Sequence, residues 1–189
     1  MINHPKIKMK FYKIIFISLL VVLISCNQTR EQTTLKTKTF NEEEQALLAI
    51  ARKVIDSAYF ATVITINNKG EAKARIMEPF KPEKDFSIYL ATNPKTRKLK
   101  EIKENNAMTL HYFDRNNPGY VSLIGKVEII NDSITKSQYF KKGWEAFYAN
   151  RTDAYTLLKF TPKQLELISI RDKKTGDKTD WKPEIVHFY

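Results

Sequence analysis

The pattern of apolar and polar positions divides the chain into three parts. Between Ile14 and Ile24, eleven consecutive residues are apolar apart from one serine. Residues 27–39 are polar or charged and contain a single large apolar side chain, Leu35. From residue 41 onward, apolar residues recur at the spacings of helices and strands. This third part therefore predicts the folded domain.

The first periodic segment predicts an amphipathic helix over residues 41–56. Asn41 is a favourable N-cap, and three glutamates follow it in the first turn, where the helix dipole favours acidic side chains. Apolar residues recur at helical spacing along the segment, at Leu47, Leu48, Ala51, Val54, Ile55 and Ala58.

The following segments alternate short runs of β-branched and aromatic residues with turn signals, a pattern typical of strands. Strong hairpin signals lie at Asn67–Gly70 and Asn116–Gly119. Seven strands are expected, at residues 59–66, 71–77, 86–90, 108–113, 120–131, 155–160 and 165–170. Such a series predicts a mainly β fold, an antiparallel barrel or sandwich with a few local helices.

Two further helices are expected between these strands. One begins at Thr96, with Leu99 and Ile102 on its inner face. The other begins at Asp132 or Ser133 and carries five aromatic residues, Tyr139, Phe140, Trp144, Phe147 and Tyr148. We expect Trp144, Phe147 and Tyr148, which recur at helical spacing, to dock this helix on the barrel.

The N-terminal segment has the features of a secretory signal. Four lysines precede the apolar run, which is too short for a membrane-spanning helix of about twenty residues. The run ends in Leu23-Ile24-Ser25-Cys26, which resembles a bacterial lipobox and contains the only cysteine of the chain. We therefore expect a signal peptide at residues 1–25, a lipidated Cys26 with a flexible tether at 26–40, and a domain at 41–189. An ordinary signal peptide with an accidental cysteine, or a short membrane anchor, are the alternatives.

This interpretation places the protein in a bacterial cell envelope, lipid-anchored to a membrane and facing the periplasm or the exterior. The full chain has 32 basic and 21 acidic residues and a formal charge of +11; removal of residues 1–25 removes four lysines and no acid, which leaves +7. An exported protein is not expected to meet nucleic acid. The remaining charge indicates a solvated surface and a site for a phosphate-bearing ligand.

Composition excludes several classes of site. The five glycines lie at positions 70, 119, 125, 143 and 176, a spacing that excludes GxGxxG, GxSxG and GxxxxGK motifs. One cysteine and three histidines exclude an intrachain disulfide and an HExxH protease, and leave almost no room for a structural zinc site.

The segment from Leu90 to Lys98 carries the most informative chemistry. It predicts a strand end, a loop and a helix start, and a helix N-terminus presents free N–H groups and partial positive charge. Thr92 and Thr96 add hydroxyl donors, and Arg97 and Lys98 add full charges. Arg75 lies on the preceding strand, beside this loop. These groups form a candidate phosphate site; the alternative is a capped surface helix with solvated cations.

Several segments in this order resemble a known family. They are Arg75-Ile76-Met77, Tyr89 to Asn93, Thr96-Arg97-Lys98, Ile102 to Asn106, Thr109 to Phe113 and Val121 to Glu128. Together they are similar to the pyridoxamine 5′-phosphate oxidase-like superfamily of FMN-binding split β-barrels, especially its general stress protein 26-like branch. The resemblance covers roughly residues 45–170 and implies a Greek-key antiparallel split barrel that is completed as a homodimer, with FMN at the subunit interface.

The resemblance also implies roles for individual residues. Arg75 would meet the FMN phosphate, which a Thr-Arg-Lys triplet would also hold, and two residues after the arginine would run along the flavin ring. The full set of implied cofactor-binding residues is Arg75, Ile76, Met77, Ala91, Thr92, Thr96, Arg97, Lys98 and Tyr120.

Two departures from the true oxidases concern the substrate. Phe80 stands where the oxidases carry a lysine near the flavin, and Trp181 is not followed by the arginines that bind the vitamin phosphate. The expected function is an FMN-dependent oxidoreductase that uses a small-molecule electron donor or acceptor. The alternatives are a non-catalytic flavin- or haem-binding stress-response protein and a cofactor-free interaction domain at the membrane surface.

Overall fold

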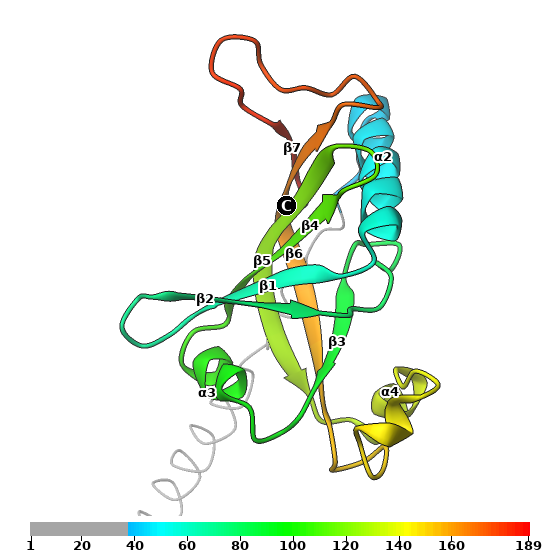
Figure 1. Cartoon of the computed structure of the whole chain (residues 1–189), viewed down its shortest axis with the longest axis vertical. Helices are drawn as coiled ribbons and strands as arrows, with labels where there is room; N and C mark the ends of the chain where they lie inside the picture. Colours follow the sequence, from blue (N-terminus) through cyan, green and yellow to red (C-terminus); the bar gives the residue numbers. More distant parts are fainter. Residues whose placement is uncertain (1–37) are drawn as a thin grey trace, which may run out of the picture. The chain divides into compact units, whose positions relative to one another are not determined.

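The computed structural model describes residues 38–189 (Figure 1). The expected signal peptide, Cys26 and most of the expected tether lie outside the described residues. Within the described part, no helix is both long and apolar enough to cross a membrane.

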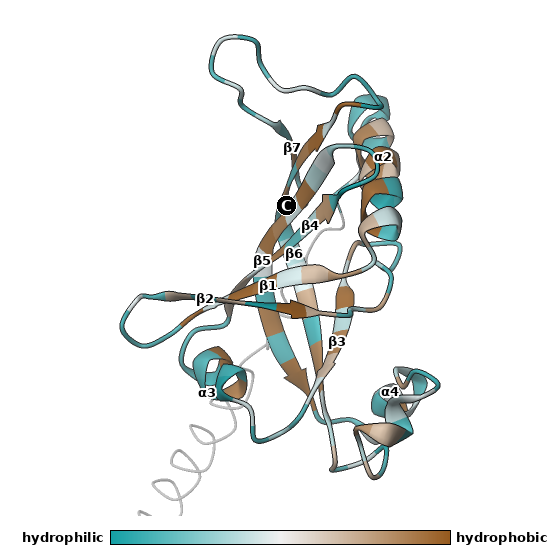
Figure 2. Ribbon diagram, in the orientation of Figure 1, coloured by the Kyte–Doolittle hydropathy of each residue, from teal (hydrophilic) through white to brown (hydrophobic). Residues whose placement is uncertain are grey.

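The first helix of the domain is α2, Glu42–Ala58, as its apolar spacing predicts. A capping box fixes its start, because the Glu44 N–H donates to Asn41 Oδ1 at 2.8 Å and the Asn41 N–H donates to Glu44 Oε2 at 3.1 Å. One face is buried against β4, β5 and β6, and comprises Leu47, Leu48, Ala51, Val54 and Ile55. Figure 2 shows this apolar face toward the sheet and the polar face away from it.

Seven antiparallel strands form one sheet in residues 38–189. They are β1 (Ala61–Ile66), β2 (Ala72–Met77), β3 (Ile88–Thr92), β4 (Ala107–Asp114), β5 (Gly119–Ile130), β6 (Thr156–Ser169) and β7 (Glu184–His187). The strand order is β2-β1-β4-β5-β6-β3, with β7 also paired to β6. The strands β2 and β3 thus lie at opposite ends of this strand order, although they follow each other in the sequence. Beyond β2, the Phe80 N–H donates to the Tyr89 carbonyl of β3 at 2.8 Å and links these ends. The mainly β, split-barrel expectation is confirmed.

The core lies between the inner face of this sheet and α2. Alternate residues of β1, β4, β5 and β6 supply it, with fully buried side chains such as Val63, Leu110, Leu123 and Leu165. The helix α3 (Arg97–Glu104) adds Leu99 and Ile102 and packs against β1, as expected.

The two strands expected at 155–160 and 165–170 are wrong, because β6 runs through Thr161 and Pro162 without interruption. The pairing with β5 shifts register between Ile124 and Gly125, which places Gly125 opposite Pro162. A proline has no N–H for the ladder and is tolerated at such a bulge. The seventh strand is instead β7, near the C-terminus.

The long aromatic helix expected after Asp132 is also wrong. The helix α4 covers only Ser133–Gln138, and a single 3-10 turn, η1, covers Trp144–Ala146. Between them Lys141 binds Glu78, and Gly143 adopts a left-handed φ of +93°. Both features interrupt a regular helix, so the aromatic side chains face more than one neighbour.

Candidate functional site

The predicted phosphate-binding residues meet where β2, β3 and the N-terminus of α3 come together. Thr92 ends β3, Thr96 is the N-cap of α3, and Arg97 and Lys98 form its first turn. We call this group the cradle; it comprises Arg75, Thr92, Thr96, Arg97, Lys98 and a residue that the sequence analysis missed, Glu101.

Glu101 organises one side of the cradle. Its carboxylate is buried on α3 and accepts hydrogen bonds at Oε2 from the Thr65 hydroxyl, at 2.5 Å, and from Arg75 Nη2, at 3.0 Å. Arg75 Nη1 also donates to Thr65 Oγ1 at 2.7 Å. Burial raises the pKa of Glu101, but the Thr65 hydrogen bond and the Arg75 guanidinium outweigh this effect and hold that pKa below its ordinary value.

Arg97 forms an ion pair with the same carboxylate. Its Nε lies 3.0 Å from Glu101 Oε1, in an arrangement without hydrogen-bond geometry. The Arg97 side chain is 72% exposed, whereas that of Arg75 is 18% exposed. Arg75 is therefore the rigidly held cation of the two, and Arg97 can turn toward a ligand at little cost.

Lys98 and two threonines form the other side. Lys98 Nζ donates to Thr92 Oγ1 at 2.5 Å and lies 3.5 Å from Thr96 Oγ1, and the two hydroxyl oxygens are 3.3 Å apart. Burial and the nearby Arg75 charge lower the pKa of Lys98. A bound anion would counter both effects, because it would compensate the two positive charges.

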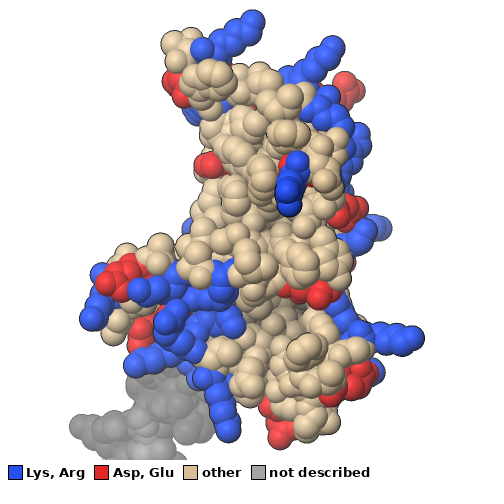
Figure 3. Space-filling model, viewed as in Figure 1, with Lys and Arg blue, Asp and Glu red and all other residues tan. Residues whose placement is uncertain are grey.

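The charges of the cradle fit a phosphate group. Three cations surround a single carboxylate, which leaves two positive charges, the number that a phosphate dianion neutralises. Figure 3 shows lysine and arginine side chains gathered over α3 and the neighbouring part of β2. Hydroxyls at Thr92 and Thr96 add uncharged donors of the kind that bind phosphate oxygens.

A groove of about 560 Å³ lies beside β2 and β3; residues that neighbour the cradle in sequence line it, but the cradle residues themselves do not. Three predicted flavin-contacting residues line one part of it, namely Ile76, Met77 and Ala91. Ile76 directly follows Arg75 on β2, and Ala91 directly precedes Thr92 on β3, so within each pair the two side chains point to opposite faces of the strand. The other part of the groove is aromatic: Trp144, Phe147 and Tyr148. Trp144 and Tyr148 also pack against the buried Ala91, Tyr155 and Leu157, so these two dock on the barrel as expected, whereas Phe147 is 78% exposed.

Tyr120 does not join the cradle within one chain. Pairing of β1, β4 and β5 places Tyr120 on the outer face of the sheet, opposite to Arg75 and beside His111. His111 Nδ1 lies 2.9 Å from Ser122 Oγ on this face. Ile76 also lies there and is 66% exposed. The outer face thus presents apolar and aromatic side chains to the surroundings of the chain.

One signal for Glu101 was present in the sequence. Glu101 stands four residues after Arg97, the spacing of neighbours on a helix surface. The same spacing is typical of exposed ion pairs, and the contact between Glu101 and Thr65 is non-local. The burial of the Glu101 carboxylate was therefore not predictable from the sequence.

The fold and the cradle define a mainly β protein of the split-barrel type with a cationic site. The sequence matches the pyridoxamine 5′-phosphate oxidase like family over residues 48–175, and the chain belongs to this family.

Solved structures show the same fold. The chain is similar to a protein related to general stress protein 26 from Clostridium acetobutylicum, with 24% identity, a TM-score of 0.62, and coverage of 76% of this chain and 95% of that chain. General stress protein 26 from Bacillus anthracis gives 20% identity, a TM-score of 0.59 and coverage of 75% and 98%. A pyridoxamine 5′-phosphate oxidase-related, FMN-binding protein from Nostoc punctiforme has 11% identity and a TM-score of 0.53, with coverage of 80% of this chain and 100% of that chain. No curated protein matches the sequence.

Proposed function

We propose that this chain binds FMN and acts as an FMN-dependent oxidoreductase. The observation that carries the proposal is the cradle, where two excess positive charges and two hydroxyls meet, while the residues next to them in sequence line a groove of about 560 Å³. Membership of the pyridoxamine 5′-phosphate oxidase like family, and the FMN-binding protein among the structural neighbours, support the choice of flavin.

Different residues would bind the phosphate and the ring of FMN. Arg75, Thr96, Arg97 and Lys98 would hold the phosphate, and Thr92 would orient Lys98 through its hydrogen bond. The strand residues of the groove, Ile76, Met77 and Ala91, would contact the ring. When bound, FMN supplies the electron transfer, and the protein supplies position and electrostatics.

Two features argue against vitamin B6 as the substrate. Phe80 packs edge-on against Tyr139 and Trp144, with ring centroids 5.2 and 5.4 Å away, and brings no charge to this region. Trp181 is 76% exposed and has no arginine after it. The proposed activity therefore uses another small-molecule electron donor or acceptor.

The proposal includes assembly and location. A homodimer formed through the outer face of the sheet would cover Ile76, Phe113 and Tyr120 and would bring Tyr120 toward the flavin of the partner subunit. A lipid on Cys26 would tether this dimer to a membrane of the cell envelope, facing the periplasm or the exterior.

Spectroscopy of the native protein tests the flavin proposal. We expect a yellow protein with flavin absorbance, and a released ligand with the mass of FMN. Reoxidation after anaerobic reduction by a nicotinamide donor would then report turnover. A colourless protein that takes up no flavin would favour the cofactor-free interaction domain, a haem spectrum would favour the haem-binding alternative, and bound FMN without turnover would favour a flavin-storage role.

A further inference from the structure

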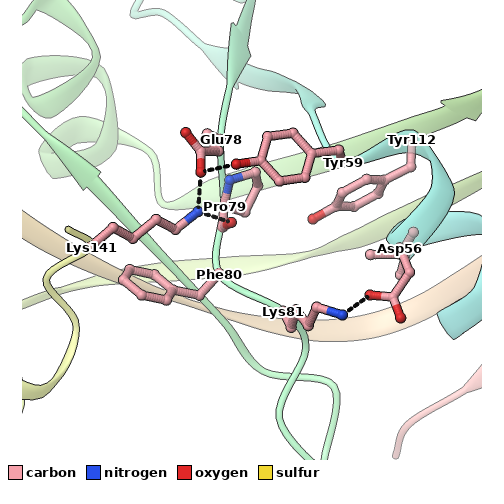
Figure 4. A pocket seen from close by; sticks show the side chains of 9 residues that line it. Asp56, Tyr59, Glu78, Pro79, Phe80, Lys81, Tyr112 and Lys141 are labelled. Carbon is pink, nitrogen blue, oxygen red and sulfur yellow. Dashed lines mark hydrogen bonds and ion pairs between the residues drawn. The ribbon is translucent and has the colours of Figure 1, made fainter. Parts of the chain in front are cut away.

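A second cavity, of about 340 Å³, lies next to the groove but is lined by different elements. The C-terminal end of α2, the segment that follows β2, Tyr112 of β4 and Lys141 surround it (Figure 4). Glu78 is the one residue that lines both cavities. We call this cavity the Tyr112 pocket.

Tyr112 contributes an unusual polar group to the pocket. Its side chain is 1% exposed, and its hydroxyl has no hydrogen-bond partner among the described residues. Figure 4 shows the hydroxyl pointing toward the space between Tyr59, Phe80 and Asp56. A buried hydroxyl without a partner is costly, so this position favours a ligand that supplies one. Burial also raises the pKa of Tyr112, so that the hydroxyl is a hydrogen-bond donor at neutral pH.

The charged groups of the pocket are already paired. Lys141 Nζ donates to Glu78 Oε1 at 2.7 Å and to the Pro79 carbonyl at 2.9 Å, and Lys81 lies 2.9 Å from Asp56. The positive charges of the two lysines and the negative charges of the two acidic side chains therefore sum to zero. A charged ligand would have to break one of these pairs or remain uncompensated, so the pocket favours a neutral ligand.

Three of the nine residues that line the pocket, Tyr59, Phe80 and Tyr112, are aromatic and present flat rings. Tyr59 follows the last residue of α2 with a left-handed φ of +63°, and its hydroxyl donates to Glu78 Oε1 at 2.6 Å. Phe80 faces it under Lys141, whose ammonium lies 5.0 Å from the Phe80 ring centre and 5.8 Å from that of Tyr59. Such walls complement a planar apolar ring.

We propose that the Tyr112 pocket binds a small, neutral, planar aromatic molecule with a carbonyl oxygen, which accepts a hydrogen bond from the Tyr112 hydroxyl. The ring contacts the aromatic side chains of the pocket wall, Tyr59 and Phe80. This site is separate from the cradle, and its occupation does not require FMN.

A ligand pair that differs only at the acceptor oxygen tests the proposal. Acetophenone and ethylbenzene are titrated against the full chain by ligand-detected NMR, without flavin. We expect saturable binding of acetophenone about three- to tenfold tighter than that of ethylbenzene, the range that one neutral hydrogen bond provides. Equal affinities, or no saturable binding of acetophenone, would overturn the proposal.

The Tyr112→Phe variant tests the role of the hydroxyl. It removes an unpaired buried group, so it is expected to fold at least as well as the natural chain. Acetophenone should then bind no better than ethylbenzene, whose affinity stays unchanged; Tyr189→Phe, which alters an exposed tyrosine outside the pocket, should change neither. An unchanged preference for acetophenone in Tyr112→Phe would refute the assignment.

A last arm separates this pocket from the flavin site. FMN added to the acetophenone complex should leave acetophenone bound, because the two ligands occupy different cavities. Displacement would mean that the flavin ring occupies the Tyr112 pocket, and would overturn the assignment of a separate ligand. Failure of acetophenone to bind leaves the flavin proposal standing, since the titration contains no flavin.

Discussion

At the scale of single residues, Glu101 explains why three cations can stay together without a ligand. Its buried carboxylate is hydrogen-bonded to Thr65 and Arg75 and ion-paired with Arg97. It compensates only one of the three positive charges, so the cradle keeps an excess that attracts anions. The same contact fixes Arg75 in place, and a fixed guanidinium can bind phosphate bidentately, whereas Lys98 acts as a point charge.

Arg75→Ala should weaken FMN binding more than any other single change in the cradle. A charge-assisted hydrogen bond contributes about 1.5–3 kcal/mol, which corresponds to about ten- to a hundredfold in affinity. Riboflavin lacks the phosphate, so its weak binding should hardly change. Fluorescence titrations of both flavins measure the two effects.

Lys73→Ala is the matched control for this prediction. Lys73 lies two residues before Arg75 on the same face of β2 and pairs with Glu71 instead of the cradle. Its removal should leave FMN affinity unchanged. Equal losses of FMN and riboflavin in Arg75→Ala would mean that this arginine is structural.

Glu101→Gln should make the stability of the domain less dependent on pH. The pKa of Glu101 in the folded chain is below its ordinary value of 4.5, so the carboxylate stabilises the fold in full above that value and loses its effect as the pH falls through the folded pKa. At pH 7 the substitution should lower the free energy of unfolding by about 1.5–3 kcal/mol.

The difference from the natural chain should narrow as the pH falls below 4.5, which urea unfolding at pH 7 and pH 3 can measure. Glu104→Gln alters an exposed carboxylate on the same helix and serves as the control. A difference for Glu101→Gln that is the same at both pH values would contradict this explanation.

At the scale of elements, local pattern predicted most of the fold. The helix α2 and the strands β1, β4 and β5 follow from periodicity, because each has one buried face, and the turn residues after β1 predict its hairpin with β2. The sequence interpretation failed at β6 and after α4, where non-local contacts decide. Gly125 allows β6 to pass through Pro162, and after α4 Lys141 pairs with Glu78 and Gly143 adopts a left-handed φ.

The candidate site shows the same division. Motif order assigned Arg75, Thr92 and the Thr96-Arg97-Lys98 triplet to a phosphate site. The structure brings these residues together. The partners Glu101 and Thr65 come from different elements, 36 positions apart, and no local pattern distinguishes them from surface residues. Trp144 and Tyr148 pack against the barrel as predicted, but on a 3-10 turn and a loop, and Phe147, assigned to the same face by helical spacing, is exposed.

Gly125→Ala should strongly destabilise the domain. A Cβ at this position would stand 2.1 Å from the Thr161 carbonyl oxygen and 2.8 Å from Pro162 Cα, both backbone atoms. The strands must separate to admit it, at a cost of about 3 kcal/mol in the free energy of unfolding. Urea denaturation measures the change.

Gly70→Ala provides the comparison. Gly70 has a φ of +78° but open space around it, so its substitution should cost only the backbone strain, about 1 kcal/mol. Gly125→Ala with a stability equal to that of Gly70→Ala would show that the close approach of β5 and β6 is easily relaxed.

At the scale of the whole molecule, the split-barrel domain follows an N-terminal segment for which we propose an export signal. The family match covers residues 48–175, and the N-terminal part lies outside both this match and the described residues. A membrane tether would confine the domain to one surface, where small redox-active molecules from outside the cell could reach it.

Cys26→Ala should release the protein from the membrane. The lipobox interpretation makes the thiol of Cys26 the lipid acceptor, so the variant should lose labelling by a fatty-acid probe and move to the soluble exported fraction. Cell fractionation with the probe measures both. Unchanged membrane association of the variant would instead indicate a retained N-terminal anchor.

The most direct test of the central claim is a fluorescence titration of the full natural chain with FMN and with riboflavin. If the cradle holds the phosphate, FMN should bind saturably and at least about tenfold more tightly than riboflavin, the difference that one charge-assisted contact provides. Absence of saturable FMN binding, or equal affinities for the two flavins, would contradict the account.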